Sequence, residues 1–181
     1  MRAMVDVPTL ETARLRLRPY RLEDYDAYAA MWADPQVVRY IGGKPFSREA
    51  SWTRFLRYVG IWQLLGFGFL VIEEKATGRF GGECGFHDLH RAISPSNEGT
   101  MEAGYGLVAA LHGQGLAEEA MRAMFDWAAV HGRGDRYTAI VDPENLASLR
   151  VAEKLGFKRL TVTQYNGAPW VLLEQKRVPG K

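Results

Sequence analysis

Two glycines separated by one residue lie between a predicted strand and a predicted helix. The strand is the apolar run 103–108, the turn is HGQG at residues 112–115, and an amphipathic helix begins near Leu116. A glycine turn that leads into a helix presents backbone N–H groups with no partner inside the helix. Because Gly113 and Gly115 have no Cβ, a phosphate group can approach the backbone closely. The stretch therefore predicts a binding site for a phosphate-bearing cofactor.

Several kinds of glycine loop compete for this turn. A P-loop needs a Lys-Ser or Lys-Thr pair after the glycines, and none is present. The dinucleotide fingerprint GxGxxG fits Gly113 and Gly115 but meets Glu118 at its third glycine. The acetyl-CoA loop pattern, Gln/Arg-x-x-Gly-x-Gly/Ala, fits Gly115 and Ala117 and departs at His112. A glycine turn that only joins a strand to a helix is the remaining interpretation.

Three segments of the chain resemble the GNAT superfamily of N-acetyltransferases. HGQGLAEEAM at residues 112–121 resembles its motif A, and NLASLRVAEKLGF at residues 145–157 is similar to its Asn-x-x-Ser…Glu-Lys-Leu-Gly-Phe segment. ETARLRLRP at residues 11–19 resembles the opening of the RimJ/RimL branch, which includes acetyltransferases of ribosomal-protein N-termini. The resemblance covers residues 10–176 and implies acetyl-CoA as the acetyl donor.

The resemblance also implies which residues hold the cofactor. The amides of the glycine turn face the pyrophosphate, and the strand edge near Leu107 and Val108 pairs with the amides of the pantetheine arm. A backbone N–H near Val108 is expected to stabilise the oxyanion. The expected cofactor-binding residues are Leu107, Val108, His112, Gly113, Gln114, Gly115, Leu116, Ala117, Asn145 and Ser148.

Acetyl transfer to an amine needs a base, because an alkylammonium group of pKa ~10.4 is almost fully protonated at neutral pH. Glu102 lies where the superfamily often carries its base, and Glu83 on the neighbouring strand is the second candidate. Many GNAT enzymes protonate the leaving thiolate with a Tyr at the position that is Ala152 here. The RimJ/RimL branch suggests Ser148 for that role. A thiol has pKa ~8.5, so the thiolate is a fair leaving group and a dedicated acid is not essential.

Other chemistry has weaker support in the sequence. Cys84 has no legible His-Cys arrangement that would activate it as a nucleophile. His87-x-x-His90 has no third ligand at a recognisable spacing, so we expect no metal site. The net charge of +2 gives no general electrostatic case for nucleic acid or a membrane as partner. Arg14, Arg16 and Arg18 alternate along a strand, which predicts a solvated strand face with a secondary possibility of phosphate contact.

The elements that position these residues follow from periodicity and from turn residues. Ser47 is the expected N-cap of a helix whose buried stripe comprises Trp52, Phe55, Leu56 and Val59. The predicted strands are 14–18, 66–74, 79–89, 103–108, 137–141, 157–164 and 169–175, and the predicted helices are 22–33, one after Ser47, 116–130 and one capped by Asn145.

The element order βααβββαβαββ predicts a single α/β domain, and the resemblance identifies it as a GNAT fold with a mixed central sheet. The strand–helix–strand unit 101–141 implies a local parallel pair. In GNAT proteins these two strands splay apart and the cofactor enters the gap. We expect residues 1–9 to be a lead-in, 10–176 to be the domain and 177–181 to be a tail.

A chain of 181 residues with one cysteine fits one domain without disulfides, in a reducing compartment. Residues 1–10 lack the apolar core of a secretory signal, so we expect a cytoplasmic protein. The oligomeric state, monomer or homodimer, is not legible.

The sequence thus predicts transfer of the acetyl group of acetyl-CoA to a primary amine by direct attack in a ternary complex. The acceptor, a protein N-terminus or a small-molecule amine, stays open; Glu83, Asp88 and Glu102 would favour a cationic amine if all face the cleft. The alternative is a non-catalytic acyl-CoA-binding domain with a regulatory or partner-binding role, because His112 and Ala152 depart from the family pattern. A nucleotide-binding module is the third interpretation.

Overall fold

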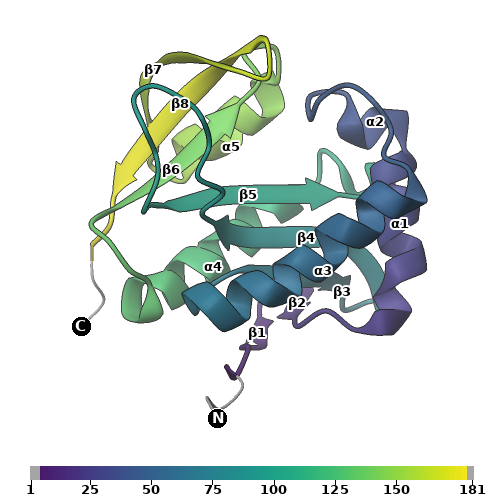
Figure 1. Cartoon of the computed structure of the whole chain (residues 1–181). Helices are drawn as coiled ribbons and strands as arrows, with labels where there is room; N and C mark the ends of the chain where they lie inside the picture. The colour runs from purple at the N-terminus through teal and green to yellow at the C-terminus, as the bar shows by residue number, and fades with distance from the viewer. Residues whose placement is uncertain (1–4, 179–181) are drawn as a thin grey trace.

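Eight strands form one mixed sheet in the computed structural model, which describes residues 5–178 (Figure 1). Their order across the sheet is β1-β2-β3-β4-β5-β6-β8-β7. The strands are β1 (Leu10–Glu11), β2 (Leu15–Arg18), β3 (Phe69–Glu74), β4 (Arg79–His87), β5 (Met101–Leu107), β6 (Arg136–Val141), β7 (Lys158–Tyr165) and β8 (Ala168–Lys176). The helices are α1 (Tyr25–Ala33), α2 (Pro35–Val38), α3 (Arg48–Leu65), α4 (Leu116–His131) and α5 (Leu146–Lys154), with 3₁₀ turns at Leu22–Asp24 and Ala109–Leu111. The predicted single-domain α/β fold is confirmed.

The parallel pair β5 and β6 divides the sheet into two antiparallel halves. The two strands are paired only at Met101 with Tyr137 and at Glu102 with Thr138. Beyond Glu102, β5 stays paired with β4 while β6 stays paired with β8. The two strands therefore separate toward their C-terminal ends, as expected for the predicted splayed pair (Figure 1).

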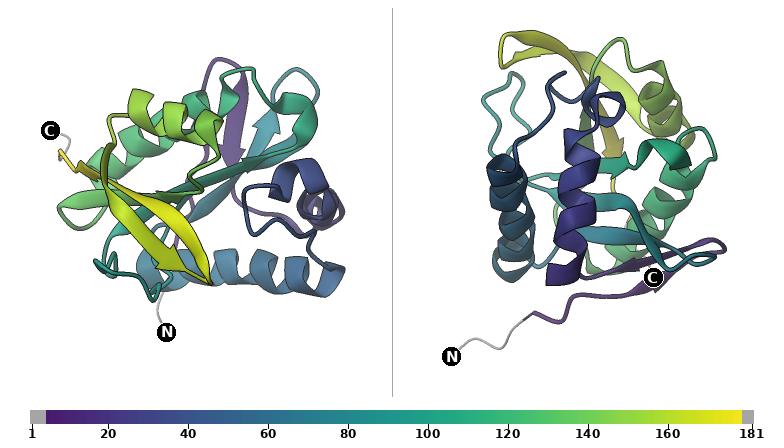
Figure 2. Two further views of the ribbon diagram at one scale, coloured as in Figure 1. Left: turned by 90° about the horizontal axis from the view of Figure 1, so that it is seen from above. Right: turned by 90° about the vertical axis from the view of Figure 1, so that its right-hand side faces the viewer.

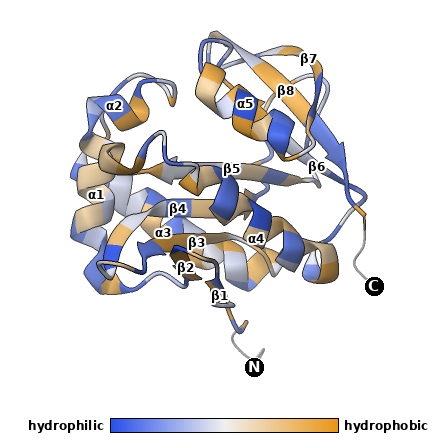
Figure 3. Ribbon diagram, turned by 180° about the vertical axis from the view of Figure 1, so that it is seen from behind, coloured by the Kyte–Doolittle hydropathy of each residue, from blue (hydrophilic) through white to orange (hydrophobic). Residues whose placement is uncertain are grey.

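Helices cover both faces of the first half of the sheet. Figure 2 shows α1 and α3 on one side and α4 on the other. The core under α4 contains Cys84 and Phe86 of β4 together with Met121 and Met124 of the helix. A second core lies between α1, α2 and α3 and includes Trp32. In Figure 3, α4 and α5 carry both hydrophilic and hydrophobic residues, as amphipathic helices on a sheet do.

The long helix α3 begins as predicted but buries a different stripe. The Ser47 hydroxyl accepts a hydrogen bond from the Ala50 amide at 3.1 Å, which confirms the predicted N-cap. The predicted buried stripe is wrong except at Phe55, because Trp52, Leu56 and Val59 are 37%, 49% and 47% exposed. Besides Phe55, the helix buries Tyr58 and Trp62, since these large rings fill the space above the sheet and the Trp62 indole finds an acceptor in the Phe69 carbonyl. The buried residues are Ser51, Phe55, Tyr58, Ile61 and Trp62.

Most predicted elements are found within three residues of their predicted bounds. The sequence missed β1 and α2, which have two and four residues and are too short to show a period. Asp34 ends α1, as predicted, and its carboxylate also caps α2 by accepting from the Gln36 amide at 2.8 Å. Pro35 in the first turn suits that second helix, because its missing N–H is not needed there.

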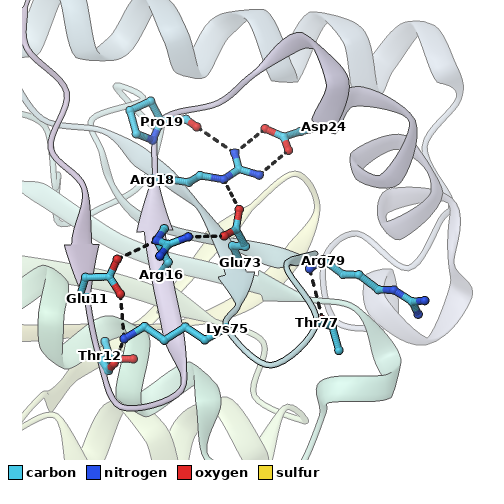
Figure 4. Close-up of polar contacts among 10 residues, drawn as sticks. All are labelled: Glu11, Thr12, Arg16, Arg18, Pro19, Asp24, Glu73, Lys75, Thr77 and Arg79. Atoms are coloured by element: carbon cyan, nitrogen blue, oxygen red, sulfur yellow. Dashed lines mark hydrogen bonds and ion pairs between the residues drawn. The ribbon is translucent and has the colours of Figure 1, made fainter.

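The prediction of a solvated face holds for Arg14 and Arg16, which are exposed, and is wrong for Arg18. Arg18 is 5% exposed, and its guanidinium donates to both oxygens of Asp24 at 2.8 Å and to Glu73 at 2.6 Å. Arg16 joins Glu73 to Glu11 (Figure 4). These contacts tie β1, β2 and β3 to the start of α1, which gives Arg16 and Arg18 a structural role.

The ends of the described chain contact the domain. The Val5 amide donates to the Gln63 side chain at 3.1 Å, and Val5 and Val7 pack against the main core. The guanidinium of Arg177 donates to carbonyls at the end of α4. None of the helices in residues 5–178 is long and apolar enough to cross a bilayer.

Candidate active site

The glycine turn forms an open cradle of backbone amides before α4. Gly113 and Gly115 both have φ +74°, a left-handed conformation that favours glycine. Within the described part of the chain, the N–H groups of residues 113–117 have no hydrogen-bond acceptor. A Cβ placed on Gly113 would meet nothing within 4 Å, so the space above the turn is free. Free amides at a helix N-terminus with open space above them fit the pyrophosphate of a cofactor.

Side chains hold this turn against β5 and β2. The Nε2 atom of His112 donates to the Leu107 carbonyl at 2.9 Å, which gives a structural role to the residue that departs from the family pattern. Arg14 donates to the carbonyl of Gln114 at 3.0 Å and pairs with Glu119 of α4. These contacts fix the turn before any ligand binds.

One expected backbone donor on this edge is already engaged. The Val108 amide donates to the Gly81 carbonyl at 3.0 Å, so the oxyanion donor expected near Val108 is not the Val108 amide itself. Val108 follows the last residue of β5 and still pairs with the neighbouring strand. Because hydrogen-bonding direction alternates along an antiparallel strand, the backbone groups of Tyr105 and Leu107 point away from β4, toward the gap. Because the Leu107 carbonyl already accepts from His112, the free strand edge comprises the N–H and C=O of Tyr105 and the N–H of Leu107.

A cavity of about 710 Å³ occupies the gap between β5 and β6. Its walls come from both faces of the sheet. On the side of α5 it is lined by Tyr105, Val141, Asn145, Ser148 and Ala152, and on the side of α1 and α3 by Trp32, Arg54, His87, Arg91 and Glu102. Of the sequence-predicted site residues, the cavity brings together Glu102, Asn145 and Ser148, while Glu83 and residues 107–117 lie outside its lining.

Ser148 is hydrogen-bonded across the gap. The Asn145 side chain accepts from the Ser148 amide at 3.1 Å, which confirms Asn145 as the cap of α5. The Tyr105 hydroxyl donates to the Ser148 Oγ at 2.9 Å, and burial raises the pKa of Tyr105. Sequence reasoning missed Tyr105. The signal that could have found it was its position on the strand before the glycine turn, two residues before Leu107.

Glu102 is buried, 3% exposed, and its carboxylate is fully engaged. It accepts hydrogen bonds from His87 at 2.9 Å, from Asn97 at 2.7 Å and from two nitrogens of Arg91 at 2.8 Å. Burial alone would raise the pKa of Glu102, but the hydrogen bonds from His87 and Arg91 and the charge of Arg91 hold that pKa at about 2. A carboxylate of such low pKa is a weak base at neutral pH, so this environment suits an anchor for residues 88–100 better than the predicted base.

Glu83 has the opposite environment. It is 0% exposed, and it accepts from the Tyr20 hydroxyl at 2.5 Å and from Arg54 at 3.3 Å. Burial raises the pKa of Glu83 in spite of the nearby Arg54 charge. Arg54 lines the cavity, so Glu83 lies one side chain behind the cavity wall.

The remaining candidate groups have ordinary structural roles. Burial lowers the pKa of His87, so its ring is neutral and its Nε2–H donates to Glu102. Cys84 is free and fully buried, and burial raises the pKa of its thiol. His90 is exposed and lies near Asp88 and Glu98. Across residues 5–178, no three His, Cys, Asp or Glu side chains are grouped as metal ligands.

Comparison with known proteins agrees with this geometry. The family described as the acetyltransferase (GNAT) domain matches residues 14–158. An uncharacterized N-acetyltransferase, p20 of Bacillus licheniformis, is 31% identical over 155 residues, which are 83% of each chain. A putative GNAT-family acetyltransferase structure from Bordetella pertussis has a TM-score of 0.81 at 31% identity and covers 93% of this chain and 99% of its own. RimL, a ribosomal L7/L12 alpha-N-protein acetyltransferase solved with coenzyme A, shares the fold with a TM-score of 0.77 at 16% identity over 96% of this chain and 100% of its own.

A sheet that splits at a parallel pair, with an amide cradle beside the split, is the arrangement expected of a protein that binds an acyl-CoA thioester. The chain belongs to the GNAT acetyltransferase family. It is an N-acetyltransferase, and acetyl-CoA is its acetyl donor.

The cradle can be tested at Gly113. Replacing Gly113 with Leu should weaken CoA binding by about tenfold or more, because the side chain fills the space where charged hydrogen bonds to phosphate form. Isothermal calorimetry with CoA measures this affinity.

Gly78 provides a matched control, since it has φ +68° and equally open space but lies in the turn between β3 and β4. Gly78→Leu should lose comparable thermal stability and keep the affinity for CoA. Equal CoA affinities for the two variants would show that the cradle does not bind the phosphates.

Proposed function

We propose that this protein transfers the acetyl group of acetyl-CoA to a primary amine by direct attack in a ternary complex. The observation that carries the proposal is the cavity in the β5–β6 gap, which is lined from the α5 side and from the α1–α3 side of the sheet. A donor and an acceptor that enter from opposite faces would meet there without a covalent enzyme intermediate. The acceptor class is a protein N-terminus or a small-molecule amine.

The chain's own residues hold the donor. The amides of residues 113–117 bind the pyrophosphate, and the free edge at Tyr105 and Leu107 pairs with the pantetheine amides. Acetyl-CoA supplies an acetyl group activated as a thioester. In the transfer, a bond forms between the amine nitrogen and the acetyl carbon and the carbon–sulfur bond breaks. The amine gives up one proton, and the sulfur takes up another.

Glu83 is the proposed base, although the sequence favoured Glu102. Its raised pKa places it nearer to neutral pH than that of Glu102, and a base works best with a pKa near the working pH. Glu83 lies directly behind Arg54, so a shift of that one side chain opens it to the cavity. Glu102 holds Arg91 and His87 in place on the same face.

Ser148 is the proposed acid, in the position that the RimJ/RimL resemblance suggests. Because Tyr105 donates to the Ser148 Oγ, the serine hydroxyl hydrogen is free to point into the cavity. The sulfur then takes its proton from Ser148, Tyr105 passes its own proton to the serine, and solvent in the cavity returns a proton to Tyr105. Tyr105 is a positioning and relay residue in this scheme, and it stands in for the aromatic acid that Ala152 lacks.

Two further assignments are part of this proposal. Membership of the RimJ/RimL branch is supported by the segment at residues 11–19 and by the fold shared with RimL. A reducing, cytoplasmic setting is supported by the single, free and buried Cys84.

Release of CoA thiol from acetyl-CoA, measured with and without a panel of amines and N-terminal peptides, tests the function. We expect thiol release that depends on the acceptor. The product should be about 42 Da heavier than the acceptor, because an acetyl group replaces one hydrogen. Tight CoA binding without release for any amine would instead support the non-catalytic acyl-CoA-binding alternative.

The roles of Glu83 and Glu102 can be distinguished by how the effects of their glutamine variants depend on pH. Glu83→Gln should lower kcat/KM by about 10²-fold or more at neutral pH, and the loss should shrink as pH rises because the amine then loses its own proton. Glu102→Gln should mainly lower stability. Its folded pKa of about 2 lies below the ordinary value of 4.5, so this loss is full above pH 4.5 and fades as pH falls toward 2.

Kinetics and urea unfolding of both variants across this pH range supply the measurement. If Glu102→Gln lowered kcat/KM by an amount that shrank as pH rose, and Glu83→Gln did not, Glu102 would again be the preferred base.

The hydroxyl pair is tested by a double-variant cycle. Tyr105→Phe and Ser148→Ala should each lower kcat by ~10–100-fold with an unchanged KM for acetyl-CoA, because they act only when the thiolate leaves. The double variant should cost no more than the larger single loss, since both residues form one relay. Losses that multiply, or that appear only in KM, would contradict the relay.

A further inference from the structure

Arginines dominate the charged lining of the cavity. Arg39, Arg54, Arg57 and Arg91 outnumber the two carboxylates, Glu102 and Asp142. On the α1–α3 side the only carboxylate in the lining is Glu102, and Arg91 pairs with it at 2.8 Å. Arg54 pairs with the buried Glu83 behind it.

Arg39 and Arg57 remain without a carboxylate partner among residues 5–178. Each lies over an aromatic ring, Arg39 at 5.1 Å from the ring centre of Tyr40 and Arg57 at 5.4 Å from that of Tyr58. An aromatic ring positions a guanidinium without cancelling its charge. The acceptor side of the cavity therefore carries a positive charge that the protein itself does not neutralise.

The buried polar atoms of the cavity lining show the same imbalance. The indole nitrogens of Trp32 and Trp170 and the Nε of Arg54 are buried without an acceptor in the described chain. These groups can only donate. Against them stands one unpartnered acceptor, the Nδ1 of the neutral His87. Because buried polar groups are normally paired, a ligand rich in acceptor oxygens suits this lining.

These arginines belong to the acceptor and not to the cofactor phosphates. Arg39 follows α2, and Arg54 and Arg57 lie on α3, whereas the glycine turn leads into α4 on the opposite side of the sheet (Figure 2). Arg54 and Arg57 also line a neighbouring pocket of about 500 Å³, whose one carboxylate is the exposed Glu49.

We propose that the amine acceptor also carries a carboxylate, which Arg39 and Arg57 bind while the amine enters the gap. This inference rests on the proposed function and deepens it. It replaces the expectation that Glu83, Asp88 and Glu102 favour a cationic amine. The first and third are neutralised by arginines, and Asp88 lies outside the lining, where it accepts from the Gly99 amide at 2.9 Å.

The test compares acceptors that differ only in the carboxylate. Thiol release from acetyl-CoA is measured with amino acids against their amides, with N-terminal peptides that carry Asp against the same peptides with Asn, and with a polyamine. We expect kcat/KM to be about tenfold or more higher for each acid than for its amide, and the polyamine to be poor. The relative rates of the amino-acid and peptide arms identify the source of the carboxylate.

Arginine variants locate the effect. Arg57→Gln and Arg39→Gln should each reduce the preference for the acid over its amide, because kcat/KM falls more for the acid than for the amide. Arg79→Gln is the matched control, because Arg79 is the exposed first residue of β4 and lies outside the lining (Figure 4). It should keep the full preference. Calorimetric titration of the acid acceptors into the protein–CoA complex gives a second readout that does not depend on turnover.

The outcomes separate the two proposals. Turnover of amides or the polyamine at rates equal to or above those of the acids would overturn this inference and leave the acetyltransferase proposal standing. An unchanged preference in both Arg39→Gln and Arg57→Gln would also overturn it. Absence of thiol release with every acceptor would overturn the proposed function and this inference together.

Discussion

The separation of β5 from β6 after two paired residues is the constraint on which the rest of the structure depends. Each strand keeps a full partner on its other side, β4 for β5 and β8 for β6, so neither loses its place in the sheet when the pair opens. The cost is a strand edge at Tyr105 and Leu107 whose backbone groups have no strand partner. Such groups need acceptors and donors, so the opened pair is a site that a chain-like ligand with amides can complete.

Buried charge fixes the acceptor face of the same opening. Glu102 accepts hydrogen bonds from Arg91, His87 and Asn97. Glu83 accepts from Arg54 and Tyr20. Each carboxylate therefore connects its strand of the sheet to segments that flank the gap. A buried ion pair adds little net stability, but it sets geometry, because removing one partner leaves an uncompensated charge. The consequence for recognition is that, within residues 5–178, the two buried carboxylates of this face are both paired with arginines, Glu102 with Arg91 and Glu83 with Arg54.

The sequence predicted the features that depend on local pattern. The glycine turn, the start of α4 at Leu116 and the caps at Ser47 and Asn145 follow from residue type and spacing, and all are found. It did not predict what depends on long-range packing. The role of Glu102 changed because Arg91 and Asn97 lie in a loop with no periodic signal. Arg18 alternates like a surface residue, and only contact with Asp24 shows that it is buried. The Tyr105–Ser148 bond joins residues 43 positions apart, which no motif in the sequence connects.

That bond also accounts for the departure at Ala152. Ala152 is 6% exposed and lies one turn after Ser148 in the same cavity wall, which also includes Tyr105. A tyrosine at position 152 would need space in this wall, where Tyr105 already packs against the main core. The small residue on α5 and the large one on β5 are therefore complementary. The wall keeps one phenolic hydroxyl near the gap, but it comes from the strand, and it reaches the gap through Ser148. In this chain the phenolic hydroxyl is carried by β5, whereas the family pattern carries it on α5. Ala152 by itself is therefore no argument for a non-catalytic domain.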